Sequence, residues 1–354
     1  MAAASDVPMR QRVEEYISKL QEDIVGAFEK LDPEAPPFKR DSWLRPQGGR
    51  GLSSVFQVPP PPPGAEALPH ETVLEKAGVN ISVVHGMLPP PAIKQMRADH
   101  SSIPDVQSAV PFFAAGLSLV IHPRNPHAPT VHANYRYFEI TEQPTEEEAA
   151  HGKPGKLIAW WFGGGSDLTP SYLYEEDAEH FHRTIRAACD AHGADLYPAF
   201  KKWCDEYFYI PHRGESRGIG GIFFDDLCDE PHKRFASDDA ARPKTAEEIF
   251  AFVRAAGDAF VPSYIPILER RYKTPSTEHE RRWQLVRRGR YVEFNLVYDR
   301  GTKFGLMTPG ARIESILMSL PETARWEYMS ELGTEAESRE GKLVEVLKNP
   351  REWA

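Results

Sequence analysis

The stretch TVHANYRYFEI, from Thr130 to Ile140, changes character at every second residue, which is the period of a β-strand with one buried face. His132, Asn134 and Arg136 stand two residues apart in it, so their side chains leave the strand on the same side. A lone histidine is most often structural, but an imidazole, an amide and a guanidinium on one face are hard to explain as core packing. We therefore predict a strand with one functional face.

Further strands are predicted on both sides of this one. Apolar and β-branched residues indicate strands over Val73–Val84 and Ala114–Ile121, which we expect to join it in one sheet. Another strand, Leu157–Phe162, leads into WWFGGGSDLTP, and a later one covers Tyr291–Tyr298. The stretch RGIGGIFFDD, Arg217 to Asp226, is predicted to be a glycine-rich turn followed by a strand that ends in two carboxylates.

Helical spacing of apolar residues dominates the termini and the second half of the chain. Thr245 and Glu248 have the spacing of a capping box at the start of one helix. The predicted helices are Val13–Leu31, Glu175–His192, Ala194–Tyr209, Thr245–Tyr272 and Arg312–Leu320, followed by an amphipathic tail that ends at Trp353. The segment Gly301–Gly310 is predicted to be a loop. Helices and strands mix without strict βαβ alternation, so the fold class is α+β, and we expect residues 1–354 to form a single domain.

Composition excludes several classes of protein. The chain has 354 residues, 41% hydrophobic content, a net charge of −10 and a pI near 5.8, which does not suit a nucleic-acid binder. Its three cysteines lack CxxC spacing, which argues against a disulfide scaffold or a structural zinc site: Cys189, Cys204 and Cys228. No apolar run approaches the roughly 20 residues of a membrane span, and the first residues lack a secretory signal. We therefore expect a soluble protein.

Two segments are predicted to be surface loops. Residues 57–70 contain the run Pro59–Pro63, which cannot form a helix or a central strand. An exposed, flexible loop explains this run most simply, and a ligand for a proline-binding module is the alternative. Residues 142–156 are acidic and contain Gly and Pro, which is typical of a surface insertion.

Two clusters carry the carboxylates that stand out as candidates. In WWFGGGSDLTP, Asp167 follows three glycines at a strand end, where a backbone can approach a ligand closely. Asp225 and Asp226 close the second glycine-rich stretch. These two could be catalytic or could neutralise nearby arginines, and the sequence does not decide between the readings.

Histidines and one arginine complete the candidate groups. His122 and His132 flank a proline-rich turn, and His212 follows an aromatic run. Of the helical pair His180 and His182, which point to different sides, we expect His182 to face the site. The cluster YDRGTKFGLMTPGAR, Tyr298 to Arg312, places Arg312 where a loop enters a helix, as a carboxylate clamp requires; a surface arginine is the alternative.

Three long motifs resemble oxygen-dependent coproporphyrinogen III oxidases. They are WWFGGGSDLTP, YPAFKKWCDEYFYIPHRGESRGIGGIFFDD (Tyr197 to Asp226) and RRGRYVEFNLVYDRGTKFGLMTPGARIESILMSLP (Arg287 to Pro321), and the likeness runs from about Met9 to Trp353. The resemblance implies a large antiparallel sheet flanked by helices on both sides, a homodimer, and oxidative decarboxylation of two propionates of coproporphyrinogen III to vinyl groups. Protoporphyrinogen IX, CO2 and H2O2 are the implied products, in heme biosynthesis.

The resemblance also implies roles for individual residues. Dioxygen is the implied co-substrate, with no obligatory cofactor. His132 matches a proton donor and, with Asp167 and Arg136, forms the expected catalytic set. The expected substrate contacts are Ser118, Asn134, Tyr135, Arg136, Gly310, Ala311 and Arg312. A divalent metal is an option, with His122, His132, His182 and His212 as its ligands.

These implications agree with the residues. A tetrapyrrole with four propionates carries about four negative charges at neutral pH, so an acidic protein must gather cations locally, and Arg136 and Arg312 are candidates. Asp167 could accept hydrogen bonds from the pyrrole N–H groups. Two rivals stay open: a metal enzyme built on the four histidines, and a non-catalytic tetrapyrrole carrier. We expect a cytoplasmic protein, or one of the mitochondrial intermembrane space if a presequence has been removed; the general base stays unassigned.

Overall fold

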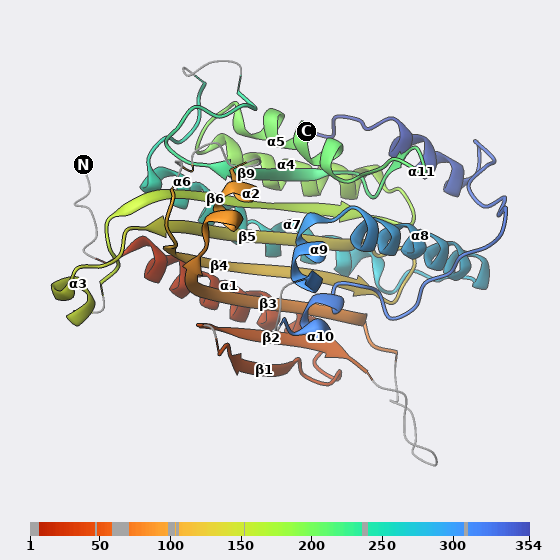
Figure 1. The fold of residues 1–354 in the computed structure, drawn as a ribbon. Coiled ribbons are helices and arrows are strands. Elements are labelled where there is room, and N and C mark those ends of the chain that lie inside the picture. Colours follow the sequence, from red (N-terminus) through yellow and green to blue (C-terminus); the bar gives the residue numbers. More distant parts are fainter. Residues whose placement is uncertain are drawn as a thin grey trace, which may run out of the picture.

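The computed structural model describes residues 7–46, 48–58, 71–97, 103, 106–151, 153–235, 240–307 and 311–354. Its centre is a seven-stranded antiparallel sheet in the order β1-β2-β3-β4-β5-β6-β9 (Figure 1). The strands are β1 Lys39–Leu44, β2 Gly49–Gln57, β3 Leu74–Leu88, β4 Val110–Pro123, β5 Thr130–Thr141, β6 Leu157–Thr169 and β9 Gly221–Leu227. A separate two-stranded ribbon pairs β7 Tyr209–Ile210 with β8 Glu215–Ser216. The first six strands of the sheet follow one another in sequence order, so strands that are consecutive in the chain pair with each other from β1 to β6.

Helices cover both faces of this sheet, as the resemblance implies. Figure 1 shows α8, α9 and α10 crossing one face, while α1 and α7 lie behind the strands. The helices are α1 Met9–Leu31, α2 Pro90–Met96, α3 Glu146–Ala150, α4 Glu175–Asp190, α5 Leu196–Tyr207, α6 Ala246–Asp258, α7 Phe260–Arg271, α8 Glu278–Val297, α9 Arg300–Met307, α10 Ile313–Leu317 and α11 Arg339–Lys348. The predicted α+β class is confirmed. No described helix is both long enough and apolar enough to cross a membrane.

One face of the sheet is the main hydrophobic core. On β5 the side chains of Val131, Ala133, Tyr135 and Tyr137 alternate onto this face and are buried. Helix α1 lies against it because its apolar residues recur at helical spacing and are all buried: Val13, Ile17, Leu20, Ile24, Val25 and Phe28. The two-residue period of the strand therefore directs the intervening residues to the opposite face.

The opposite face, which we call the polar face, carries three rows of residues that cross the sheet. Paired residues in antiparallel strands point to the same side, so the strand register defines each row. The first row is Trp43, Gly51, Ser82, Gly116, Arg136 and Gly163; the second is Asp41, Ser53, Asn80, Ser118, Asn134 and Gly165; the third ends in Val120, His132 and Asp167. Small and polar residues thus replace the aliphatic ones of the core face.

Most predicted strands and helices are present, with shifted ends. The strand predicted over Leu157–Phe162 continues as β6 through all three glycines to Thr169, so the glycines lie inside the sheet. The helix predicted over Thr245–Tyr272 is divided at Ala259 into α6 and α7, and its capping box is present. Residues 142–156 contain the short α3. Pro59–Pro63 and the rest of 59–70 lie outside the described residues, and the single-domain assignment stays a prediction.

Two predictions near the C-terminal half were wrong. Tyr291–Tyr298 is not a strand but the last part of α8, whose buried residues Arg287, Tyr291 and Phe294 recur at three- and four-residue spacing. The loop predicted over Gly301–Gly310 is helical in its described part, because helix α9 covers Arg300–Met307, and residues 308–310 lie outside the described residues. Aromatic and β-branched residues favour a strand locally, and packing of α8 across the sheet overrides that preference.

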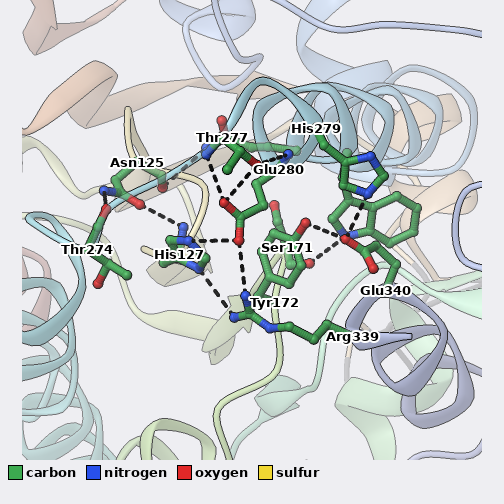
Figure 2. A network of polar contacts seen from close by, with 12 residues as sticks. Asn125, His127, Ser171, Tyr172, Thr274, Thr277, His279, Glu280, Arg339 and Glu340 are labelled. Atoms are coloured by element: carbon green, nitrogen blue, oxygen red, sulfur yellow. Dashed lines mark hydrogen bonds and ion pairs between the residues drawn. The ribbon is translucent and has the colours of Figure 1, made fainter. Parts of the chain in front are cut away.

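A polar network holds the beginning of α8 in place (Figure 2). The Thr277 side chain accepts from the Glu280 backbone N–H and Glu280 accepts from the Thr277 backbone N–H, which closes a capping box. Arg339, at the start of α11, donates to Glu280 at 3.0 Å, and the ring of His127 lies 3.3 Å from the same carboxylate. Burial lowers the pKa of His127 below its usual value. The network fixes the helix that covers one end of the polar face.

Candidate functional site

His132 and Asp167 meet across neighbouring strands of the polar face. They are register partners in β5 and β6, and His132 Nδ1 lies 2.7 Å from Asp167 Oδ1. The His132 side chain is 21% exposed, whereas that of Asp167 is 2% exposed. The imidazole therefore stands between the carboxylate and solvent.

Arg217 holds the second oxygen of Asp167. Its guanidinium donates to Asp167 Oδ2 at 2.6 Å and to Asn295 Oδ1 at 3.1 Å, and its side chain is only 2% exposed. Three aromatic rings surround this cation, with centroids 4.1, 4.6 and 4.9 Å from its central carbon: Phe208, Tyr291 and Phe294. Sequence-distant β6, α8 and the segment before β9 thus meet at one buried ion pair.

The charges of this group fix the proton positions. Burial alone would raise the pKa of Asp167, but Arg217 and His132 more than offset it and hold the pKa below its usual value. An ionised carboxylate only accepts hydrogen bonds, so Nδ1 of His132 carries the proton that faces Asp167. The other ring nitrogen, Nε2, is then left for a ligand on the polar face, as a base when neutral and a donor when protonated.

A second charged group lies further along the polar face. Arg136 donates to Asn134 Oδ1 at 3.2 Å and forms an ion pair with Asp225 Oδ1 at 2.9 Å. Arg300, at the start of α9, lies 3.9 Å from the other oxygen of Asp225 and is 52% exposed. Two guanidinium groups share the carboxylate of Asp225, and Asp299 also acts electrostatically on Arg136. The planar N–H donors of the two arginines are what this end of the face offers to a carboxylate ligand.

Comparison with known proteins identifies the family. A model of the coproporphyrinogen III oxidase family matches residues 12–353. The chain belongs to the coproporphyrinogen III oxidase family. An oxygen-dependent coproporphyrinogen-III oxidase of Drosophila melanogaster is 52% identical over 345 residues, 98% of this chain and 78% of that protein.

Relatives from mammals and plants are similar to nearly the same extent. A human protein named oxygen-dependent coproporphyrinogen-III oxidase, mitochondrial, is 52% identical over 98% of this chain and 67% of its own length. A chloroplastic protein of that name from Glycine max is 49% identical over 99% of this chain and 81% of its own length. The resemblance predicted from the motifs is therefore confirmed over almost the whole chain.

The structure brings together most of the catalytic and substrate-binding residues expected for the family. Ser118, Asn134 and Arg136 lie half-buried on the polar face with His132 and Asp167, since β4, β5 and β6 are neighbours. Asp225 is the partner of an arginine, which favours the neutralising reading that the sequence left open.

Tyr135 is placed elsewhere. Its side chain is 1% exposed on the core face, and its hydroxyl donates to the backbone oxygen of Ala256 in α6 at 2.9 Å. Because adjacent residues of a strand point to opposite faces, Tyr135 cannot share the polar face with Asn134 and Arg136. A ligand there would meet the backbone of Tyr135 rather than its side chain, and the substrate contact expected at this position stays a prediction.

Arg312 lies at the β1 edge of the polar face, away from Arg136. Its guanidinium forms an ion pair with Asp41 and lies 4.7 Å from the centre of the Trp43 ring. Four strand spacings of about 4.8 Å separate β1 from β5, so Arg312 and Arg136 stand at opposite ends of the face. Ala311 is adjacent to Arg312, and Gly310 lies outside the described residues.

The four histidines expected as metal ligands do not converge. Burial lowers the pKa of His122 to about 3, and its ring contacts Thr130 and Ser319. His182 is fully buried in α4 against Tyr197, behind the sheet rather than on the polar face. In the part of the chain that the structure describes, no group of three or more His, Cys, Asp or Glu side chains could hold a metal ion.

His212 belongs to a separate, more exposed cluster. Its ring lies 2.7 Å from Glu293 and 2.7 Å from the hydroxyl of Tyr298. Although burial raises the pKa of Glu293, hydrogen bonds from Arg213 and His212 lower it to about 2. This carboxylate is therefore ionised and binds His212. His212 thus belongs to a different cluster from His132.

Sequence reasoning missed three residues of the site. Arg217, Asn295 and Arg300 all lie in the quoted motifs, but none was assigned a role. A signal existed for Arg217, since a buried carboxylate such as Asp167 requires a buried cation. No sequence pattern pairs Asn295 with that cation, because the contact depends on α8 crossing the sheet.

Proposed function

We propose that this protein oxidises coproporphyrinogen III on the polar face, converting two propionates to vinyl groups with dioxygen as oxidant. The products are protoporphyrinogen IX, CO2 and H2O2. One observation carries the site assignment: the line of contacts His132–Asp167–Arg217 ends in a partly exposed imidazole on the strand face that also carries Arg136. The family membership supports the reaction. The contacts from Arg217 through Asp167 orient His132 as a proton-transfer group, on the same face as the arginine proposed to bind a substrate carboxylate.

Charge and shape support this substrate. The middle of the polar face is half-buried and lined by small residues, which suit contact with the face of a flat ring: Ser82, Gly116, Ser118 and Asn134. Arg136 and Arg300 can bind one propionate through paired N–H donors. Arg312 and its neighbours Gly310 and Ala311 are proposed to bind another at the β1 edge.

The proposed chemistry balances without an organic cofactor. For each propionate, the β-carbon gives up a hydrogen with two electrons to dioxygen, and the bond from the α-carbon to the carboxyl carbon breaks. The electron pair of that bond becomes the new C=C bond as CO2 leaves. Dioxygen needs one further proton to become H2O2, and Nε2 of His132 is the proposed donor. No protein base is assigned to this step, because the hydrogen leaves the β-carbon with its electron pair.

Asp167 is proposed to act through His132. It fixes the Nδ1–H tautomer and stabilises the imidazolium, which a buried, ionised carboxylate does well. Direct acceptance of the pyrrole N–H groups, the role the sequence suggested, requires Asp167 to exchange a partner it already holds. Arg136 is proposed to orient the reacting propionate.

The test is turnover of coproporphyrinogen III by the purified protein, with and without dioxygen. The proposal expects oxygen-dependent formation of protoporphyrinogen IX, followed as porphyrin fluorescence after oxidation, and loss of that activity in His132→Asn. Binding of coproporphyrin without any turnover by the wild type would reject the enzyme and favour a carrier.

Two further expectations depend on the family. We propose a homodimer, to be measured by light scattering. The apolar segment Ile313–Leu320 is a candidate for its interface: Met318 packs on Gly78, whereas Ile313 stays 40% exposed. We propose a cytoplasmic location, with the mitochondrial intermembrane space as the alternative. Mammalian relatives are named mitochondrial and plant ones chloroplastic.

A further inference from the structure

The edge strand β9 contains an irregularity beside Arg136. Phe162 of β6 pairs with Leu227 and Gly164 pairs with Phe224, so two residues of β9, Asp225 and Asp226, stand opposite the single residue Gly163. Asp226 has a φ of 58°, in the left-handed region that aspartate tolerates better than most residues. This is a β-bulge, a device that re-aims side chains next to functional sites.

The bulge and Gly163 together make room for one ion pair. Gly163 is buried and is the register partner of Arg136, whose side chain crosses it to reach Asp225. A Cβ atom placed on Gly163 would lie 2.6 Å from Arg136 Nε and 2.7 Å from Asp225 Oδ1. Both distances are far below van der Waals contact, so the present position of the guanidinium requires glycine here.

Gly164 and Gly165 are constrained by the backbone of the neighbouring strands instead. A Cβ on Gly164 would lie 2.6 Å from the backbone oxygen of Asn134, and one on Gly165 would lie 2.3 Å from that of Ile222. Those contacts involve sheet backbone, which cannot move without breaking strand pairing. At Gly163 the nearest atoms are the ends of two flexible side chains, so a methyl group there displaces the ion pair and spares the sheet.

We propose that Gly163 and the bulged Asp225 are positioning residues that fix the Arg136 guanidinium for a substrate carboxylate. Asp225 holds one edge of the guanidinium, and its other oxygen attracts Arg300 to the same place. The bare backbone of Gly163 lets the guanidinium lie flat on the floor of the polar face. This inference rests on the proposed function for its substrate, a tetrapyrrole that carries propionates.

The test is a double-mutant cycle between Gly163→Ala and Arg136→Lys. The measured quantity is the affinity for coproporphyrin III, a stable tetracarboxylate, followed by quenching of tryptophan fluorescence. Gly163→Ala alone should weaken binding about tenfold, the value of one misplaced charge-assisted hydrogen bond, and raise KM more than it lowers kcat. In the Arg136→Lys background the methyl group meets no guanidinium, so the same substitution should change binding much less.

The matched control is Gly26→Ala in α1, where an added Cβ meets nothing within 4 Å, and binding should not change. Equal weakening by Gly163→Ala in both backgrounds would overturn the inference, as would unchanged binding in the single variant. Because binding is read without turnover, an inactive wild type that still binds coproporphyrin and shows the coupling would reject the proposed reaction while keeping this inference.

Discussion

Replacing Arg217 by methionine should reveal how much the buried ion pair contributes. Arg217 and Asp167 are both 2% exposed and 2.6 Å apart, so the substitution leaves a buried carboxylate that keeps its contact with His132 but loses its arginine. Removing one partner of a buried pair costs about 3–5 kcal/mol. Methionine packs well among Phe208, Tyr291 and Phe294, so we expect a loss near the lower end, about 3 kcal/mol.

The assay is urea unfolding at neutral pH, followed by tryptophan fluorescence, on four proteins: wild type, Arg217→Met, Asp167→Asn and the double variant. Since the double variant has no unpaired buried charge, it should regain part of the stability that Arg217→Met loses. Arg287→Met is the matched control. It breaks a different buried ion pair, between Arg287 of α8 and Glu215 at 2.6 Å, which does not include Asp167. It should destabilise the protein similarly, while only Arg217→Met should also lower kcat beyond the effect of stability.

A loss below about 1 kcal/mol in Arg217→Met, the range of an exposed pair, would refute the claim that this cation neutralises a buried carboxylate. A double variant no more stable than the single one would refute it as well.

Three other predictions follow from individual contacts. The pKa of Asp167 is lowered in the folded state, so the stability that this carboxylate contributes is present above the pKa of the unfolded chain, ~3.9, and is lost as pH falls through the lower folded pKa. The unfolding free energy of the wild type should therefore fall more steeply below about pH 4 than that of Asp167→Asn. Parallel plots of unfolding free energy against pH for the two proteins would contradict the assignment. Tyr135→Phe should cost about 0.5–1.5 kcal/mol through the lost bond to Ala256 without changing KM, whereas a raised KM would show that the Tyr135 side chain takes part in substrate binding. Treatment with a strong chelator should leave turnover unchanged, because His122, His182 and His212 each have partners away from His132; lost activity that added metal restores would refute this.

Local patterns predicted the strand that carries the site. The alternation in 130–140 placed His132, Asn134 and Arg136 on one face, because a two-residue period needs no knowledge of the rest of the fold. The same rule places the Tyr135 side chain on the opposite face, whereas the family resemblance implies a substrate contact at that position. The carboxylate Asp167 was found from its glycine-rich setting, although those glycines lie within a strand and not in a turn.

Long-range contacts could not be predicted in the same way. Arg217 stands 50 residues from Asp167 and Asn295 stands 78 residues from Arg217, and they meet only because α8 crosses the polar face. The last seven residues of that helix, Tyr291–Val297, were predicted to be a strand, since Tyr291, Val292 and Phe294 favour a strand when they are read without their packing. Sequence spacing also gave no reason to separate His122, His182 and His212, which the folded chain places in three environments.

The central claim is that Asp167 acts on the substrate through His132. Its most direct test is to measure kcat for His132→Asn, Asp167→Asn and the double variant. Binding of coproporphyrin III is measured alongside, to show that each variant keeps an intact site. Residues that act as one unit lose activity non-additively, so the double variant should turn over about as slowly as the worse single variant. If the two losses multiply instead, Asp167 has a contact with the substrate of its own and the proposed arrangement is wrong.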